Sequence, residues 1–217
     1  MGEARDTDRP PGTAGYGEQA ERLAAQYEAV TFAEVHREAL HLFPTRPADV
    51  LDIGAGSGRD AAALAALGHR VVAAEPTAEL RRIGERRHAD SGVRWVDDAL
   101  PALPRLGATG ARFDVVLLTA VWMHLAPDER PPAMDALTAL LAPAGRFFLS
   151  VRHGPVPPGR RMYDAPAVEV LALARTRGLH PLLHTERPDL HGRSDVHWTE
   201  LVLSGAPSVR QAAVAHE

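Results

Sequence analysis

Short apolar runs alternate with longer segments of helical spacing along this chain, and this alternation constrains the fold more than any other feature. The runs predicted to be strands are 49–53, 71–74, 93–96, 113–118, 145–151, 180–185 and 196–203. The predicted helices are one or two within 18–42, then 59–67, 78–88, 131–141 and 165–177. Strands that alternate with helices of this length form parallel, doubly wound sheets.

The connection between the last two predicted strands sets the direction of the final one. Residues 186–197 are too few for a helical crossover, so the last strand is expected to return antiparallel. We therefore predict an α/β fold with a doubly wound sheet of seven strands, mostly parallel, whose last strand is antiparallel.

The chain divides into four predicted parts. Residues 1–15 combine proline, glycine and charge without periodicity and are predicted to be disordered. Helices within 16–44 form a possible lid, 45–204 form the main domain, and 205–217 are a flexible tail.

A glycine-rich loop follows the first predicted strand, with the sequence DIGAGSG at residues 52–58. At such a turn the backbone bends sharply, approaches a ligand closely and presents the N–H groups of the next helix. In a dinucleotide-binding fingerprint the third glycine falls one residue later, where this chain has Arg59. The chain also has no Gly-Lys pair, which excludes a phosphate-binding P-loop.

This D-x-G-x-G-x-G spacing resembles motif I of the class I S-adenosylmethionine (SAM)-dependent methyltransferases. Three further segments occur where that family has them. Glu75 ends the second predicted strand, the sequence DDAL follows the third at 97–100, and LLAPAGR at 140–146 leads into the fifth. The segment 113–125 is similar to the family's "FDxV…HL" segment. The resemblance covers roughly residues 49–203 and implies a Rossmann-like fold, with SAM as cofactor and S-adenosylhomocysteine (SAH) as product.

The resemblance also implies which residues hold SAM. Asp52 would anchor the ammonium end of its methionine, and Glu75 would accept hydrogen bonds from the ribose hydroxyls. Asp98 would meet the adenine amine, although the register leaves Asp97 as an alternative. The full predicted cofactor set is Asp52, Gly54, Ala55, Gly56, Gly58, Glu75, Asp97, Asp98, Ala99 and Thr119. No metal site is expected.

Candidates for the methyl-transfer chemistry follow the fourth and fifth strands. His124 is the first candidate for a general base and His153 the second, because imidazole titrates near neutral pH. The residues expected to contact the acceptor are Tyr27, Trp122, Arg152 and Trp198. Tyr16 fits an aromatic lid, and five arginines are candidates to neutralise a carboxylate or phosphate, with a solvated surface as their alternative role: Arg152, Arg160, Arg161, Arg187 and Arg193.

Composition limits the possible functions. A formal charge of −4 argues against general nucleic-acid binding. With no cysteine there is no thiol nucleophile, and with no lysine there is no Schiff base. The chain has no apolar run long enough to span a membrane and its first residues lack an apolar core, so the expected location is the cytoplasm.

The resulting hypothesis is methyl transfer to an oxygen or nitrogen of a small-molecule acceptor. The alternatives are a non-catalytic SAM-binding regulatory module, a tRNA or peptide methyltransferase and, less favoured by the glycine spacing, an NAD(P)-dependent oxidoreductase. The identity of the acceptor and the oligomeric state are not predicted by the sequence.

Overall fold

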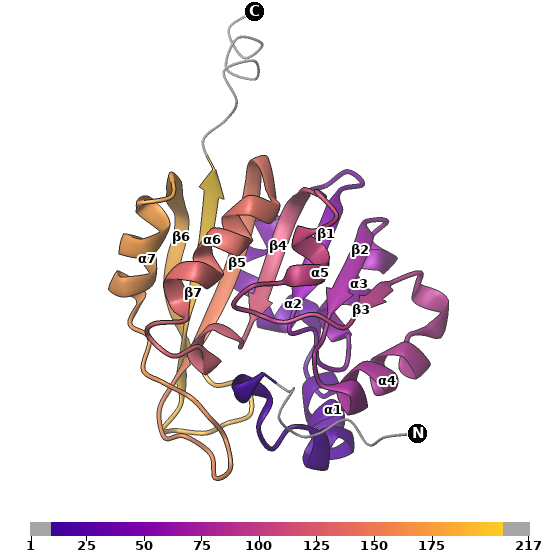
Figure 1. Ribbon diagram of the computed structural model, residues 1–217. Helices are drawn as coiled ribbons and strands as arrows, with labels where there is room; N and C mark the ends of the chain where they lie inside the picture. The colour runs from indigo at the N-terminus through magenta and orange to yellow at the C-terminus, as the bar shows by residue number, and fades with distance from the viewer. Residues whose placement is uncertain (1–9, 206–217) are drawn as a thin grey trace, which may run out of the picture.

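A seven-stranded sheet forms the centre of the protein, which we describe from a computed structural model for residues 10–205 (Figure 1). The strands are β1 (Asp49–Ile53), β2 (Arg70–Ala74), β3 (Arg94–Val96), β4 (Phe113–Thr119), β5 (Leu141–His153), β6 (Leu179–Pro188) and β7 (His197–Gly205). Their order across the sheet is β3-β2-β1-β4-β5-β7-β6. β7 is antiparallel to both neighbours and the other pairings are parallel, which confirms the predicted fold class.

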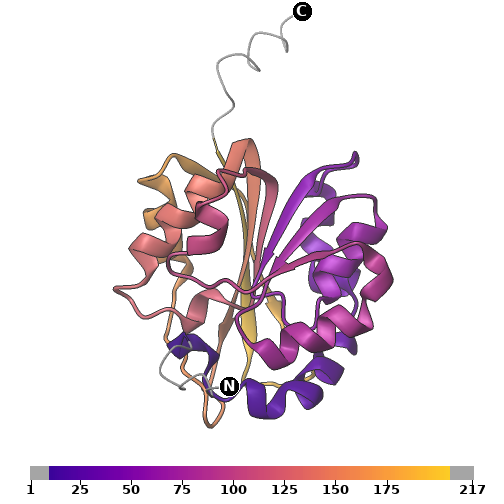
Figure 2. The same ribbon diagram turned by 45° about the vertical axis from the view of Figure 1, so that its right-hand side comes forward.

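Helices cover both faces of this sheet, as Figure 2 shows nearly edge-on. The α-helices are α1 (Ala20–Glu28), α2 (Phe32–Val35), α3 (Arg59–Ala66), α4 (Ala78–Arg87), α5 (Pro104–Gly107), α6 (Arg130–Leu140) and α7 (Ala167–Arg175). Short 3-10 helices include η2 (Pro11–Thr13), η3 (Gly17–Gln19), η4 (Arg37–Leu42), η5 (Ala89–Ser91) and η6 (Trp122–His124). No helix in the described part of the chain is long and apolar enough to cross a membrane.

The strands are apolar on both sides because each buries both faces. In β4, Val116 and Leu118 pack into a cluster with α5, α6 and α7, while Val115 and Leu117 pack on the opposite face with α2, η4 and α3. Successive strand side chains point to opposite faces, so a central strand needs a continuous apolar run. The uninterrupted run that predicted β4 has this cause.

The N-terminal segment lies beneath the carboxyl ends of the parallel strands, at the lower edge of the sheet in Figure 1. There α1 packs on α4, with Ala20 and Ala24 against Leu80 and Ile83. The prediction of disorder for 1–15 is wrong for residues 10–15, which form η2 and a turn closed by a hydrogen bond from the Tyr16 N–H to the Thr13 carbonyl. Residues 1–9 and, of the predicted tail, 206–217 lie outside the described residues.

Candidate active site

A cavity of about 970 Å³ lies at the carboxyl ends of the parallel strands. It is bounded by the glycine loop, by the N-terminal segment from η2 to α1, and by the loops that follow β5 and β6. The predicted site residues that line it are Tyr27, Asp52, Gly54, Ala55, Gly56, Glu75, Asp97, Asp98, Ala99, Thr119, His124, Arg152 and Trp198. Most of the predicted set therefore meets in one space, although it comes from segments far apart in the chain.

Three predicted site residues do not line this cavity. Trp122 is fully buried in the core beneath it, since the 3-10 turn η6 directs this side chain inward. His153 instead contacts Thr199 Oγ1 at 2.8 Å and stacks on His197 across the β5–β7 pair. Neither position supports the acceptor or base role expected from the sequence.

Gly58 is the third, because its role is in packing. It has a φ of 90° at the start of α3, and a Cβ there would lie 2.8 Å from the Trp95 ring. Gly54 and Gly56 do line the cavity. A Cβ on Gly56 would stand 3.3 Å from the ring of Tyr27, where the lid helix approaches the loop closely.

Asp52, at the end of β1, is a buried carboxylate with an unsatisfied oxygen. Its side chain is 2% exposed, and its Oδ2 has no hydrogen-bond partner among the described residues. Burial raises the pKa of Asp52 well above its usual value, and the nearby charge of Asp60 raises it further. A buried acceptor without a donor is costly, so this oxygen suits a cationic group entering the cavity.

Glu75, at the end of β2, is also buried, and two backbone groups orient it. Its Oε2 accepts the Gly56 N–H at 2.8 Å, and its Oε1 accepts the Thr77 N–H at 2.7 Å. Burial raises the pKa of Glu75, against these two hydrogen bonds. An ionised carboxylate has about four acceptor sites, so each oxygen keeps one for a ligand hydroxyl.

The two acids after β3 differ in their surroundings. Asp98 is buried, and its Oδ2 accepts the Leu106 N–H at 2.8 Å in the first turn of α5. Asp97 is half exposed and pairs with Arg81 at 3.0 Å. Both line the cavity, but only Asp98 is held in place by the backbone, through the short helix α5 that the sequence analysis missed.

His124 is hydrogen-bonded through both ring nitrogens. Its Nδ1 lies 2.7 Å from the Arg161 carbonyl, which can only accept, so Nδ1 carries the proton. Its Nε2 then accepts from the Tyr16 hydroxyl at 2.9 Å. Burial lowers the pKa of His124, with Arg160 and Arg161 adding to the effect, while burial raises the pKa of Tyr16 to about 12. Both groups are therefore neutral near pH 7.

The sequence predicted Tyr16 as an aromatic residue of a lid and did not predict its hydrogen bond with His124. The two residues are 108 positions apart, and no periodicity or motif connects them. The pairing arises because η2 and η3 fold against η6, where Gly12 also approaches the His124 Cβ closely.

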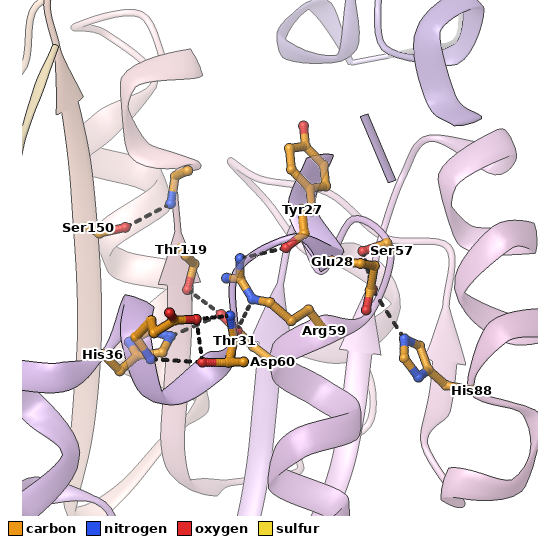
Figure 3. Close-up of polar contacts among 12 residues, drawn as sticks. Tyr27, Glu28, Thr31, His36, Ser57, Arg59, Asp60, His88, Thr119 and Ser150 are labelled. Carbon is orange, nitrogen blue, oxygen red and sulfur yellow. Dashed lines mark hydrogen bonds and ion pairs between the residues drawn. The ribbon is translucent and has the colours of Figure 1, made fainter. Parts of the chain in front are cut away.

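A buried polar network beneath the glycine loop joins α1 and the end of α2 to the sheet (Figure 3). Asp60 Oδ2 contacts His36 Nε2 at 3.0 Å and accepts the Thr119 hydroxyl at 2.9 Å. Its Oδ1 accepts from Arg59 Nε at 2.7 Å, and Arg59 also donates to the Tyr27 carbonyl at the end of α1. Because Thr119 and Tyr27 line the cavity, this network positions two of its walls.

A second pair of contacts secures the end of α1 to the loop. The Ser57 hydroxyl donates to Glu28 Oε1 at 2.7 Å, and His88 Nε2 lies 3.3 Å from the same oxygen, as Figure 3 shows. Helix α1 is thus connected both to the glycine loop and to the end of α4. The described residues hold no group of three or more side chains suited to bind a metal ion.

Comparison with known proteins bears on which ligand this geometry serves. A family model described as a methyltransferase domain matches residues 50–145. The solved structure of a 1,6-didemethyltoxoflavin N-methyltransferase from Burkholderia thailandensis, with its substrate and SAH bound, is 26% identical to this chain. The similarity covers 94% of this chain and 98% of that one, with a TM-score of 0.63. Residues 50–145 thus match a methyltransferase domain, and the chain shares its fold with a methyltransferase that was solved with SAH bound.

Curated relatives of this chain differ in what they are named for. A demethylmenaquinone methyltransferase from Clavibacter sepedonicus is 34% identical over 117 residues, which is 53% of this chain and 46% of the relative. A ribosomal-protein methyltransferase from Bradyrhizobium diazoefficiens is 34% identical over 148 residues, 64% of this chain and 44% of the relative. This chain spans less than half the length of either relative, and these matches do not name its acceptor.

Proposed function

We propose that this methyltransferase transfers a methyl group from SAM to an oxygen or nitrogen of a small molecule, in the cytoplasm. The observation that carries the proposal is a row of buried acids, Asp52, Glu75 and Asp98, at the ends of three adjacent strands around one cavity. Each acid would meet one fragment of SAM. The unsatisfied Asp52 Oδ2 would take the ammonium, Glu75 the ribose hydroxyls and Asp98 the adenine amine.

SAM would supply a methyl group already activated by its sulfonium. The protein therefore needs to align the acceptor, exclude water and take up a proton. His124 is the base of this proposal, because its tautomer leaves Nε2 free to accept. Tyr16 stands between Nε2 and the cavity, so its oxygen would take the proton of the acceptor while its own hydroxyl proton passes to His124.

The N-terminal wall of the cavity favours a small acceptor. Residues of the N-terminal segment, among them Pro11, Gly12 and Tyr16, cover it opposite the strand ends. A folded RNA or protein chain would need this cover to move away, whereas a small molecule fits inside. A non-catalytic SAM-binding module would have no use for the oriented Tyr16–His124 pair.

Binding of SAH is the first test. With SAH at about a hundredfold excess over its Kd, we expect roughly 2.7 kcal/mol of added stability, or a rise in Tm of about 5–10 °C. The affinity should fall as the pH is lowered through the raised pKa of Asp52, because a protonated carboxyl no longer pairs with the ammonium. Thermal denaturation would measure the rise in Tm, and calorimetric titration between pH 5 and 8 would measure the affinity for SAH.

Asp52→Asn is the matched variant for this titration. It should weaken SAH binding at the pH where the wild-type carboxyl is ionised, and it should flatten the dependence of the affinity on pH. Glu75, whose pKa burial also raises, would supply the dependence that remains. No thermal shift at millimolar SAH, or an unchanged pH dependence in Asp52→Asn, would contradict the proposed donor site.

The state of His124 gives a second test that needs no acceptor. We expect NMR of the imidazole nitrogens to show the Nδ1–H tautomer at pH 7 and a titration below the usual value of about 6.5. The sign follows from burial, which disfavours the charged ring, so the base is available at neutral pH and is lost on acidification. Tyr16→Phe should shift the Nε2 resonance and leave Nδ1 unchanged. A protonated Nε2 at pH 7 would exclude the proposed role.

A further inference from the structure

The ends of β5 and β6 and the loops that follow them bring several arginines to the cavity, and three of them pair with carboxylates of the protein. Arg161 pairs with Glu129 at 3.2 Å, Arg193 with Asp189 at 2.7 Å, and Arg187 with the buried Glu200. These three guanidinium groups are held by carboxylates and need no ligand.

Arg152 and Arg160 also line the cavity, but no carboxylate of the described residues forms an ion pair with either. Within residues 10–205, Arg152 Nε is buried with no hydrogen-bond partner, and its NH1 donates to the Gly154 carbonyl at 3.3 Å. Arg160 stacks 3.7 Å above the Tyr16 ring and makes only long contacts, at 3.4 Å, with the Ala14 carbonyl and Gln19.

Arg152 keeps an unsatisfied donor at the cavity wall, since its buried Nε has no hydrogen-bond partner among the described residues. Burial lowers the pKa of Arg152 and the charge of Arg193 lowers it further, whereas the charges of Asp189 and Asp195 act in the opposite direction. An arginine with free donors binds a carboxylate through two parallel hydrogen bonds. A bound anion would both satisfy Arg152 Nε and offset the two charges.

The three buried acids and the two arginines without a carboxylate partner among residues 10–205 come from different parts of the sheet. The buried acids Asp52, Glu75 and Asp98 lie at the ends of β1, β2 and β3, whereas Arg152 is in β5 and Arg160 in the loop after it. Tyr16 lies at the boundary, since it contacts His124 through its hydroxyl and Arg160 through its ring. SAM, the cationic methyl donor, and an anionic methyl acceptor would therefore lie on opposite sides of Tyr16.

We propose that the acceptor carries a carboxylate, bound by Arg152 and Arg160, with its reacting oxygen or nitrogen directed to Tyr16. The inference rests on the proposed function, because it assigns this side of the cavity to the acceptor. The rings of Tyr16 and Trp198 beside the arginines favour an aromatic or otherwise flat acid.

The test compares salicylate with salicylamide, which has nearly the same shape without the charge. Both are titrated calorimetrically into the wild-type protein, with and without saturating SAH. We expect the acid to bind at least about tenfold more tightly than the amide, as hydrogen bonds to a charged group predict. Arg152→Gln and Arg160→Gln should each reduce this preference several-fold, and the double variant should abolish it.

Arg175→Gln is the matched control, because Arg175 is exposed on α7 and lies outside the cavity. It makes the same change in charge and should keep the wild-type preference for the acid. Circular dichroism checks that each variant is folded.

Three results would overturn the inference. The first is a wild-type protein without preference for the acid, and the second is a preference that survives in the double variant. The third is a tenfold loss of SAH affinity in the arginine variants with the acid preference intact, which would assign the arginines to the donor's own carboxylate. Failure of SAH to bind the wild-type protein would count against the proposed function, while the titrations without SAH would still report on the arginines.

Discussion

Replacing Asp60 with alanine is expected to lower the free energy of unfolding by about 3–5 kcal/mol, the usual cost of breaking a buried ion pair. Asp60 is 4% exposed, and it compensates both Arg59 and His36. Although burial raises its pKa, the charges of Arg59 and His36 outweigh burial and hold it well below its usual value. The variant would leave Arg59 buried without its carboxylate and Thr119 without its acceptor.

Urea denaturation of the wild-type and variant proteins measures this difference. Asp135→Ala is the matched control, because Asp135 contacts Arg177 Nε at the same distance of 2.7 Å but its side chain is 64% exposed. An exposed pair contributes at most about 1 kcal/mol, so the control should remain close to wild type. Equal losses of unfolding free energy in the two variants would show that burial of the Asp60 network adds nothing to stability. Should Asp60→Ala fail to fold, Asp60→Asn is measured in its place, because it keeps the volume of the side chain. Its loss of unfolding free energy is expected to lie between the roughly 3–5 kcal/mol expected for Asp60→Ala and the loss in Asp135→Ala.

Replacing Glu75 with alanine is expected to weaken SAH binding by about a hundredfold, since two hydrogen bonds to a charged group are lost at once. The same change removes the acceptor of the Gly56 and Thr77 N–H groups. The glycine loop would then lose part of its orientation as well. Glu75→Gln keeps one acceptor oxygen but turns an amide N–H₂ toward a backbone donor, so a loss of similar size is expected.

Calorimetry with SAH measures the affinity of these variants, and circular dichroism confirms that they fold. Glu85→Ala is the control, because Glu85 is an exposed acid on the neighbouring helix α4, away from the cavity. Its affinity should match that of the wild-type protein. An affinity within threefold of wild type in Glu75→Ala would contradict the assignment of Glu75 to the ribose.

Much of the fold could be predicted because the pattern that specifies it is local. The predicted and observed bounds agree within a few residues for most strands and helices, and the direction of β7 followed from the short loop before it. The elements that the sequence did not predict are short or irregular. Helix α5 has only four residues, and the turn of η2 depends on contacts that the prolines of residues 10–15 do not reveal.

The candidate site also has residues whose place could be predicted from the sequence and residues whose place could not. Asp52, Glu75 and Asp98 were assigned from the resemblance to the methyltransferase motifs, and parallel strands bring such strand-end positions to one edge of the sheet. Trp122 and His153 follow strands as well but point elsewhere. Their directions are set by the turn of η6 and by pairing with β7, which strand spacing does not encode.

What the sequence predicted by itself is the proposed donor side of the cavity, because a glycine turn and strand-end acids act through backbone geometry within a few residues. Only the tertiary structure brings together the residues of the proposed acceptor side. Tyr16 meets His124 across 108 positions, and Arg160 meets Gln19 across 141. It also decided which arginines are already neutralised and which are not. Such contacts depend on how separate elements pack, and the free energy of that packing is shared among many residues, so no single motif records it.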